Sequence, residues 1–345
     1  MRIVLEHGNY VISYKKKETI KMAKVKNFKT IFPAVSVPLN DDYSINEPEF
    51  RAYLRWIKTF YGKGMDGLVC NGHTGEITGL TRAERKRVVE ICAEECGDVM
   101  TIISGVNCEN TAESIEMAKE AKEAGADGIL LMPPHMWLRF GMNPDAPFEY
   151  VKDVAEGADI DIIIHLYPAT SKAFYPVETL IKMCKEIDHV KCIKMGTRVT
   201  SIYEHDVRLL RQECPDISLI TCHDETLCVS WFPGMDGALI GFAGCVPEII
   251  CPAREVFANP DKHTLKEAQD WSDRIYHISQ AIYGGGQPSG EAHARLKEAL
   301  KQRGIFTSAL MRKPVLPLNQ EEKDWVALGL ERSQLPEVDM TQFED

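Results

Sequence analysis

A four-residue pattern, Gly-x-Asp-Gly, occurs three times in this 345-residue chain, each time directly before a short apolar run. The three copies are Gly64-Met65-Asp66-Gly67, Gly125-Ala126-Asp127-Gly128 and Gly234-Met235-Asp236-Gly237. The first glycine can end a helix in a left-handed conformation, and the short loop then leads into a buried parallel strand. The pattern therefore predicts repeated βα units.

Apolar runs and amphipathic segments extend this repeat to eight units. The strand candidates are residues 30–37, 67–71, 100–104, 127–132, 161–167, 190–194, 217–222 and 237–242. The helix candidates are about 46–62, 81–96, 111–124, 147–156, 176–187, 199–213, 224–232 and 247–258, the second of them starting with the capping box Thr81-Arg82-Ala83-Glu84. Eight strands alternating with eight helices predict an α/β fold, a (β/α)₈ TIM barrel.

The segments outside the repeat divide the chain into three parts. Residues 1–25 are polar and Lys-rich, and we interpret them as an N-terminal appendage. Residues 26–258 form the predicted barrel and catalytic domain. After residue 258 only helical patterns follow, at about 262–283, 288–303 and 319–330, so 259–345 is predicted to be a C-terminal helical region. This region can pack on the barrel or make oligomer contacts.

Composition excludes some partners and sets the expected compartment. A net charge of −11 without any basic run argues against nucleic acid. No apolar segment reaches the roughly 20 residues that span a bilayer, and the start of the chain has no apolar signal core. The eleven cysteines are scattered and form no Cys-x-x-Cys pair, which is typical of a reducing compartment. We therefore expect a soluble cytoplasmic protein that does not bind membranes.

Lys194 stands near the end of the sixth strand candidate. In an alternating strand it shares one face with Val190 and Cys192. Burial on an apolar face depresses the pKa of a lysine, and a neutral lysine amine attacks carbonyl carbons to form a Schiff base. The alternative is a structural lysine that extends from the strand end to solvent.

Polar residues gather where the strand candidates end, which is where barrel enzymes place their active sites. The loop Gly72-His73-Thr74-Gly75-Glu76 can hold a carboxylate through its backbone N–H groups and the Thr74 hydroxyl, or it is a plain turn in which Glu76 caps the next helix. His135 and Gly241, which follow other strand candidates, are further substrate-binding candidates.

His165 and Tyr167 have the same parity on the fifth strand, so their side chains should lie on one side, roughly 6–7 Å apart. Either group can act as general acid or base, and either can instead be structural. The histidines at four strand ends also suggest a metal, but they include no His-x-His pair and come from separate strands: His73, His135, His165 and His223. We predict no metal site.

Four segments, in this order, resemble the dihydrodipicolinate synthase / N-acetylneuraminate lyase family of class I aldolases. They are the loop 72–76, the helix Leu80-Thr81-Arg82-Ala83-Glu84-Arg85, the segment 124–128 and Ile193-Lys194, and the similarity runs from about Phe32 to Leu330. The resemblance implies a barrel with C-terminal helices, usually a homotetramer built as a dimer of dimers. It also implies a pyruvate-like 2-oxo acid bound as an imine to Lys194, with no other cofactor.

Several positions depart from the family pattern. The usual catalytic tyrosine aligns with His165, and Tyr167 follows two residues later; the first threonine of the carboxylate loop is His73. The tyrosine that crosses the subunit interface aligns with about Met136, and the arginine that binds the second substrate aligns with Thr170. These changes argue against the lysine-biosynthetic reaction.

We therefore expect a lyase that makes, cleaves or dehydrates a 2-oxo acid, with an aldehyde as co-substrate or product. Residues 133–141, including Trp137, are expected to shape the pocket for the distal part of a less polar substrate. The alternatives are dihydrodipicolinate synthase proper (pyruvate plus aspartate semialdehyde), a non-catalytic 2-oxo-acid-binding barrel, and a metal-dependent barrel enzyme.

Overall fold

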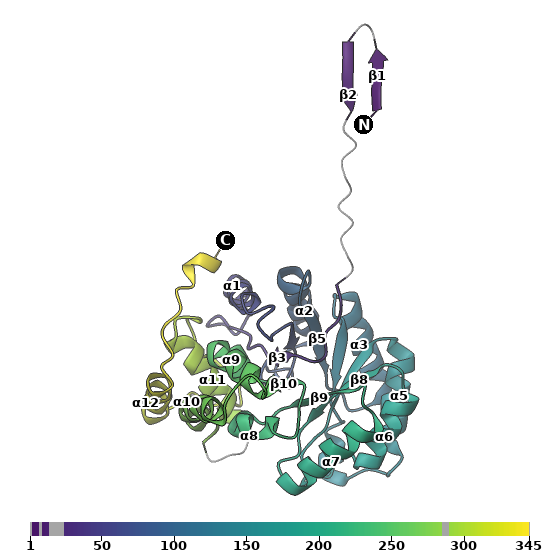
Figure 1. Cartoon of the computed structure of the whole chain (residues 1–345), viewed down its shortest axis with the longest axis vertical. Helices are drawn as coiled ribbons and strands as arrows, with labels where there is room; N and C mark the ends of the chain where they lie inside the picture. The colour runs from purple at the N-terminus through teal and green to yellow at the C-terminus, as the bar shows by residue number, and fades with distance from the viewer. Residues whose placement is uncertain (1, 7–8, 14–23, 285–289, 345) are drawn as a thin grey trace.

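The computed structural model describes residues 2–6, 9–13, 24–284 and 290–344, and its centre is a parallel barrel of eight strands (Figure 1). The sheet order is β3-β10-β9-β8-β7-β6-β5-β4, and a parallel bridge between Ala34 and Val69 brings β3 against β4 to close the ring. The strands are β3 (Ile31–Pro33), β4 (Gly67–Cys70), β5 (Thr101–Val106), β6 (Gly128–Leu131), β7 (Asp161–His165), β8 (Val190–Met195), β9 (Ser218–Thr221) and β10 (Gly237–Ile240).

Helices follow the strands and surround the barrel, as Figure 1 shows. They are α1 (Glu47–Lys58), α2 (Arg82–Cys96), α3 (Thr111–Glu123), α4 (Met136–Phe140), α5 (Ala146–Ala158), α6 (Val177–Glu186), α7 (Thr200–Glu213), α8 (Leu227–Trp231) and α9 (Pro247–Ala258), with the 3₁₀ turns η1 (Asp224–Thr226) and η2 (Phe242–Gly244). The predicted (β/α)₈ barrel is confirmed. The short helix α4, inside the loop after β6, was not predicted.

Three further helices form the C-terminal region, beside α9 in Figure 1. They are α10 (Leu265–Tyr283), α11 (Gly290–Gln302) and α12 (Gln320–Arg332), and the turn η3 (Thr341–Phe343) follows them. The predicted C-terminal helices are confirmed, and α11 and the segment after it contact Glu76 in the loop that follows β4.

The Gly-x-Asp-Gly repeats have the conformation that the sequence predicts. Their first glycines, Gly64, Gly125 and Gly234, have φ of +92°, +104° and +90°, a region that side chains other than glycine rarely occupy. The aspartates then join neighbouring strands: Asp127 Oδ2 accepts the Ile102 N–H at 2.7 Å, and Asp236 Oδ2 accepts the Leu219 N–H at 2.9 Å. The second and third repeats therefore follow the ends of α3 and α8 closely and tie the start of a strand to its neighbour. In the first repeat, by contrast, Gly64 lies beyond the end of α1 at Lys58, and the Asp66 side chain accepts from Asn27 and the Gly62 N–H.

Residues before the barrel contact its N-terminal end. Lys24 binds Asp127 at 2.5 Å and Lys26 binds Asp161 at 2.7 Å. Strands β1 (Arg2–Glu6) and β2 (Asn9–Ser13) form a separate antiparallel pair. Part of the predicted appendage 1–25 lies outside the described residues, so its boundary stays a prediction.

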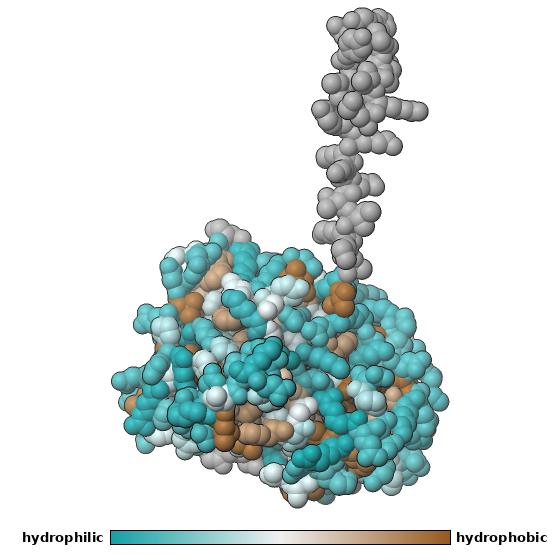
Figure 2. Space-filling model, in the orientation of Figure 1, coloured by the Kyte–Doolittle hydropathy of each residue, from teal (hydrophilic) through white to brown (hydrophobic). Residues whose placement is uncertain are grey.

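Hydrophilic residues cover most of the face seen in Figure 2, and apolar residues form small scattered areas. Among the described residues, no helix is both long and apolar enough to cross a bilayer. All eleven cysteines are free thiols, ten of them buried, which agrees with their interpretation as small core residues.

Candidate active site at the barrel mouth

A cavity of about 420 Å³ opens at the C-terminal ends of the strands. All but one of the predicted site residues line it: Gly72, His73, Thr74, His135, His165, Tyr167, Lys194 and Gly241. Gly75 is the exception; its Cα packs under the loop, where an added Cβ would lie 3.0 Å from the Val35 carbonyl oxygen. The fold thus brings together residues that are up to 169 positions apart in sequence (241 − 72).

Lys194 projects into this cavity from β8, and its Cα pairs in register with that of His165 on β7. Burial lowers the pKa of the Lys194 ammonium below its usual value, and nearby Cys222 and Asp224 oppose only part of that shift. In the described part of the chain, the Lys194 amine makes no hydrogen bond. A larger share of this amine is therefore neutral and nucleophilic than of a lysine in water.

The Tyr167 hydroxyl lies between two imidazoles. It is 3.3 Å from His135 Nε2 and 3.4 Å from His73 Nε2, and the Asn107 amide nitrogen is 3.2 Å from His135 Nε2. Burial lowers the pKa of His73 to about 3 and raises the pKa of the Tyr167 phenol, so both groups are uncharged at neutral pH. The Tyr167 hydroxyl can therefore exchange a proton with either imidazole, whereas the Asn107 amide nitrogen only donates.

His165 has a different environment from the other two histidines. Its ring lies edge-on to Tyr167 with centroids 4.9 Å apart, but no hydrogen bond joins them. Its buried Nδ1 has no hydrogen-bond partner among the described residues. Burial, with the charge of Lys194 adding to it, holds the pKa of His165 well below its usual value. His165 is thus a neutral imidazole directly beside the lysine.

The loop after β4 is held from below by a buried ion pair. Glu76, with φ of +57°, binds Lys297 of α11 and accepts the Arg312 N–H at 2.8 Å. The Glu76 carboxylate therefore joins the loop to the C-terminal region, and the alternative interpretation of Glu76 as a helix cap is wrong. No described acceptor takes the N–H groups of Thr74 and Gly75, which leaves them available to an anion.

Gly241 is required for close packing at the same loop. An added Cβ there would lie 2.8 Å from Thr74 Oγ1, a distance that real Cβ atoms essentially never show. Glycine at this position therefore lets the Thr74 hydroxyl approach the wall of the cavity.

Among the cavity residues that the sequence prediction missed are Arg198, Tyr283 and His293. His293 comes from α11, and burial lowers its pKa to about 4. Arg198, after β8, donates to Gly196 O and to Glu225. No motif marks these positions, because their distance from Lys194 depends on how the loops and the C-terminal helices pack.

Asp224, which the sequence does place at a strand end, is buried against this cavity. Burial raises the pKa of its carboxyl to about 6, although it accepts the Phe242 N–H at 2.9 Å. At pH 7 only about a tenth of this carboxyl is protonated, so it still carries negative charge beside Lys194 and opposes part of the lowering of the Lys194 pKa.

Two sequence predictions need correction. Trp137 does not line the cavity; its ring packs edge-on against Tyr150 and Tyr175, and Leu138 lines the wall in its place. His223 faces a separate cavity. In residues 24–284 and 290–344, no group of three or more His, Cys, Asp or Glu side chains is arranged to hold a metal ion.

Known proteins share both the sequence pattern and the fold. The model of the dihydrodipicolinate synthetase family matches residues 27–332. A 4-hydroxy-tetrahydrodipicolinate synthase of Bartonella bacilliformis is 26% identical over 304 residues, covering 88% of this chain and 97% of that protein. An uncharacterized DapA-like lyase of Pyrococcus horikoshii is 30% identical over 294 residues, covering 84% of this chain and 95% of that protein.

Solved structures agree on the fold. YagE, a prophage protein of Escherichia coli K12 crystallised with pyruvate, superposes with a TM-score of 0.79 at 21% identity, covering 89% of this chain and 99% of that one. The dihydrodipicolinate synthase of Aquifex aeolicus superposes with a TM-score of 0.79 at 19% identity, covering 90% of this chain and 100% of that one.

Proposed function

The chain belongs to the dihydrodipicolinate synthetase family, a family of lyases, and from this premise we propose that it forms a Schiff base between Lys194 and a pyruvate-like 2-oxo acid. The observation that carries the proposal is the Lys194 amine, whose pKa burial lowers and which lies in the cavity that Thr74 also lines. Pyruvate bound to the structurally similar YagE supports the same class of ligand. The imine itself serves as the electron sink, so we propose no further cofactor.

Each side chain has a defined part in the proposed reaction. The Thr74 hydroxyl and the N–H groups of Thr74 and Gly75 bind the carboxylate of the 2-oxo acid. The neutral Lys194 amine adds to the C2 carbonyl carbon, one amine proton and one proton from the general acid convert the former carbonyl oxygen to water, and the water leaves, which gives a protonated imine.

Cleavage of a 4-hydroxy-2-oxo acid then needs one proton removed and one returned. The base takes the proton of the C4 hydroxyl, the C3–C4 bond breaks, and its electron pair moves into the imine, giving an enamine and a free aldehyde. C3 then takes a proton, and water hydrolyses the imine to release pyruvate and Lys194. We assign the proton transfer to Tyr167, because its hydroxyl contacts both His73 and His135, and we place His165 beside the imine nitrogen.

The aldehyde half of the substrate lies toward the apolar part of the cavity, where Leu130, Leu138 and Leu239 line the wall. Met136 is 48% exposed and Thr170 is also exposed, and neither lines the cavity. The cavity thus has no arginine at the position that aligns with the family's second-substrate site. We therefore propose an apolar aldehyde in preference to aspartate semialdehyde.

Reduction with borohydride in the presence of pyruvate tests the imine. Mass spectrometry should find the adduct on Lys194, and the Lys194→Ala variant should gain no mass. An adduct on another lysine, or none, would sink the proposal. Turnover of a panel of 4-hydroxy-2-oxo acids separates an enzyme from a barrel that only binds 2-oxo acids, and activity that survives a chelator rejects the metal-dependent alternative.

For assembly, we propose the homo-oligomer that family resemblance implies, a tetramer or dimer. Sedimentation velocity at several concentrations tests this directly, and a species of 38.8 kDa at every concentration would reject it.

A further inference from the structure

Arg198 joins the ends of two neighbouring strands at the barrel mouth. The ladder between β8 and β9 ends with Met195 opposite Thr221. The next carbonyl groups along the two strands belong to Gly196 and Cys222. Arg198 Nη1 donates to Gly196 O at 2.9 Å, and Nη2 donates to Cys222 O at 3.3 Å. The planar guanidinium therefore continues the connection between the strands beyond the end of their ladder.

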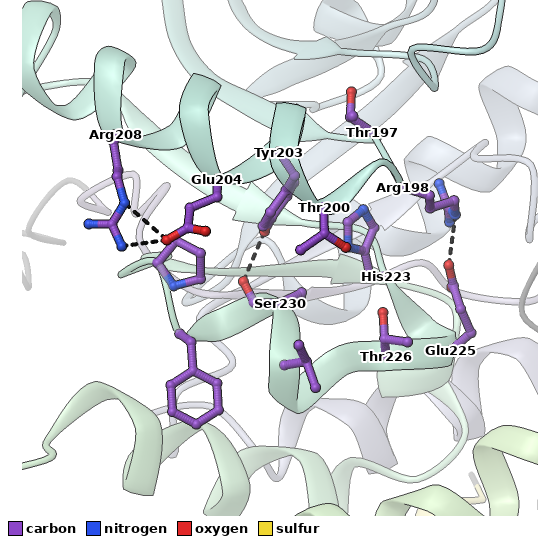
Figure 3. Close-up of a pocket in the computed structure, with 13 residues that line it drawn as sticks. Thr197, Arg198, Thr200, Tyr203, Glu204, Arg208, His223, Glu225, Thr226 and Ser230 are labelled. Carbon is purple, nitrogen blue, oxygen red and sulfur yellow. Dashed lines mark hydrogen bonds and ion pairs between the residues drawn. The ribbon is translucent and has the colours of Figure 1, made fainter.

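A buried carboxylate holds the guanidinium from its third side. Arg198 Nε donates to Glu225 Oε1 at 2.7 Å, and the side chains of Arg198 and Glu225 are only 14% and 3% exposed. Figure 3 shows the two side chains pointing toward one another, one from the loop after β8 and the other from η1. Because solvent and salt screen such a pair little, it fixes the orientation of the guanidinium.

The chain directly after Lys194 is confined on its other side by the end of β7. A Cβ added at Gly196 would overlap the Leu166 carbonyl oxygen, and the Leu166 N–H donates to the Lys194 carbonyl oxygen at 3.1 Å. The end of β8 thus lies between Leu166 and the guanidinium of Arg198. A shift of the Gly196 carbonyl would move this strand end, and with it the side chain of Lys194 two residues earlier.

The charge of Arg198 also acts on Lys194, because both side chains line the same cavity. Burial is the main cause that lowers the pKa of the Lys194 ammonium; Cys222 and Asp224 oppose the lowering, and the guanidinium charge adds to it. A guanidinium stays protonated throughout the pH range in which proteins are folded. The histidines, the tyrosines, Cys222 and Asp224 around the cavity stay unchanged in any variant of Arg198, so a change in the titration of Lys194 reports the loss of this charge.

We propose that Arg198 is a positioning residue, which holds the end of β8 and the Lys194 amine in the geometry that attack on the 2-oxo acid requires. This role rests on the proposed function, since it belongs to the same reaction. The alternative is an arginine that stabilises the fold and has no effect on the reaction.

Trapping of pyruvate on Lys194 with cyanoborohydride, followed by mass spectrometry over a series of pH values, tests this role in the full-length protein. The trapping rate should rise with pH to a plateau as the Lys194 amine loses its proton. Arg198→Lys should lower the plateau at least about tenfold, because an ammonium does not bind both carbonyl groups as the planar fork does. Its midpoint should stay near that of the wild type, since the positive charge is kept.

Arg198→Ala removes both the hydrogen bonds and the charge. Its plateau should fall at least as far, and its midpoint should move to higher pH, because the Lys194 pKa rises when the neighbouring positive charge is lost. Methylguanidinium at millimolar concentration should restore part of the rate, since the shortened side chain leaves room next to the cavity of about 520 Å³ that Arg198 also lines.

Arg208→Ala is the matched control. Arg208 lies on α7 at the same cavity and pairs with Glu204 at 2.6 Å, as the dashed lines in Figure 3 show, but its side chain is 66% exposed. This variant should leave both the plateau and the midpoint unchanged. A fall of the same size as in the Arg198 variants would overturn the inference.

The remaining outcomes separate this role from the Schiff base itself. A wild-type protein that traps no pyruvate on Lys194 would reject the Schiff base and, with it, the role of Arg198. Wild-type trapping with an unchanged plateau in Arg198→Lys would overturn the positioning role alone. So would a loss in Arg198→Ala that leaves the midpoint unchanged and does not respond to methylguanidinium.

Circular dichroism identifies any variant that does not fold. If Arg198→Ala does not fold, the plateau of Arg198→Lys decides. Failure of both variants to fold would make Arg198 a residue that only stabilises the fold and would overturn the inference.

Discussion

At the N-terminal end of the barrel, Asp127 and Asp236 each accept a backbone N–H from a neighbouring strand and also bind a cation, Lys24 or Arg211. At the C-terminal end, the amine of Lys194 and Nδ1 of His165 have no such partner among the described residues. Both ends are built from the same strands. Ionisable groups that are fully paired stabilise the fold, whereas groups that are buried and unpaired have shifted pKa values and are free to react.

Replacing Lys194 with alanine should give the largest effect at the C-terminal end of the barrel. We expect turnover of any 2-oxo acid substrate to fall by at least about 10³-fold, because the covalent route is lost. Stability should stay equal or rise, since a half-buried amine without a hydrogen bond is removed.

Asp236→Asn, at the opposite end, is the matched control. It should lower the free energy of unfolding by about 1–3 kcal/mol and leave turnover nearly unchanged, because it weakens a paired carboxylate far from the cavity. Thermal melts and initial rates on both variants check the contrast, and the reverse pattern would reject it.

Tyr167→Phe removes the hydroxyl that joins His73 and His135 and should reduce kcat by about 10²- to 10⁴-fold. His165→Ala should lower kcat less than Tyr167→Phe does, because His165 makes no hydrogen bond to Tyr167. Trapping of pyruvate on Lys194 should survive in Tyr167→Phe, which separates imine formation from proton transfer. A larger loss for His165→Ala would give His165 the main role, and no loss in either variant would exclude both.

Glu76→Gln should have the largest effect on stability at the mouth. Lys297, whose side chain is 1% exposed, would keep its charge without its partner, and breaking such a pair typically costs about 3–5 kcal/mol. The KM for pyruvate should also rise, because Glu76 holds the loop that carries Thr74. Paired replacement Glu76→Gln with Lys297→Met should recover part of the stability; no recovery would argue that the two residues act separately.

The pH dependence of stability gives the smallest and most specific contrast. His73 has a pKa of about 3 in the folded protein and about 6.5 when unfolded. Between these values the unfolded chain binds the extra proton, so His73 lowers stability as pH falls through 6.5 toward 3. Asp224 has a folded pKa of about 6, so between about pH 3.8 and 6 the folded chain binds the extra proton. Asp224 therefore raises stability as pH falls through this range.

His73→Gln should therefore reduce the slope of unfolding free energy against pH by up to about 1.4 kcal/mol per pH unit between pH 4 and 6. Urea denaturation at a series of pH values measures the slope. An unchanged slope would mean that His73 titrates normally in the folded state.

Local sequence was sufficient for the architecture. The Gly-x-Asp-Gly repeats mark where strands begin, because a positive φ at the first glycine, present in all three copies, and a strand-joining aspartate, present in the second and third, are properties of a few adjacent residues. The same holds for the capping box at Thr81 and Glu84, in which both expected hydrogen bonds form. Lys194 was identified because a barrel always places the C-terminal ends of its strands at one mouth.

The partners of these residues were decided by tertiary packing. No local pattern predicts that Tyr167 contacts both His73 and His135, or that Lys297 binds Glu76, 221 residues away. Trp137 was misassigned because an aromatic residue in a loop can pack inward or line a pocket, and only its neighbours Tyr150 and Tyr175 decide which. The sequence thus determined the barrel and the place of Lys194 at its mouth, while the burial that shifts each pKa and the contacts of Tyr167 with His73 and His135 required the folded chain.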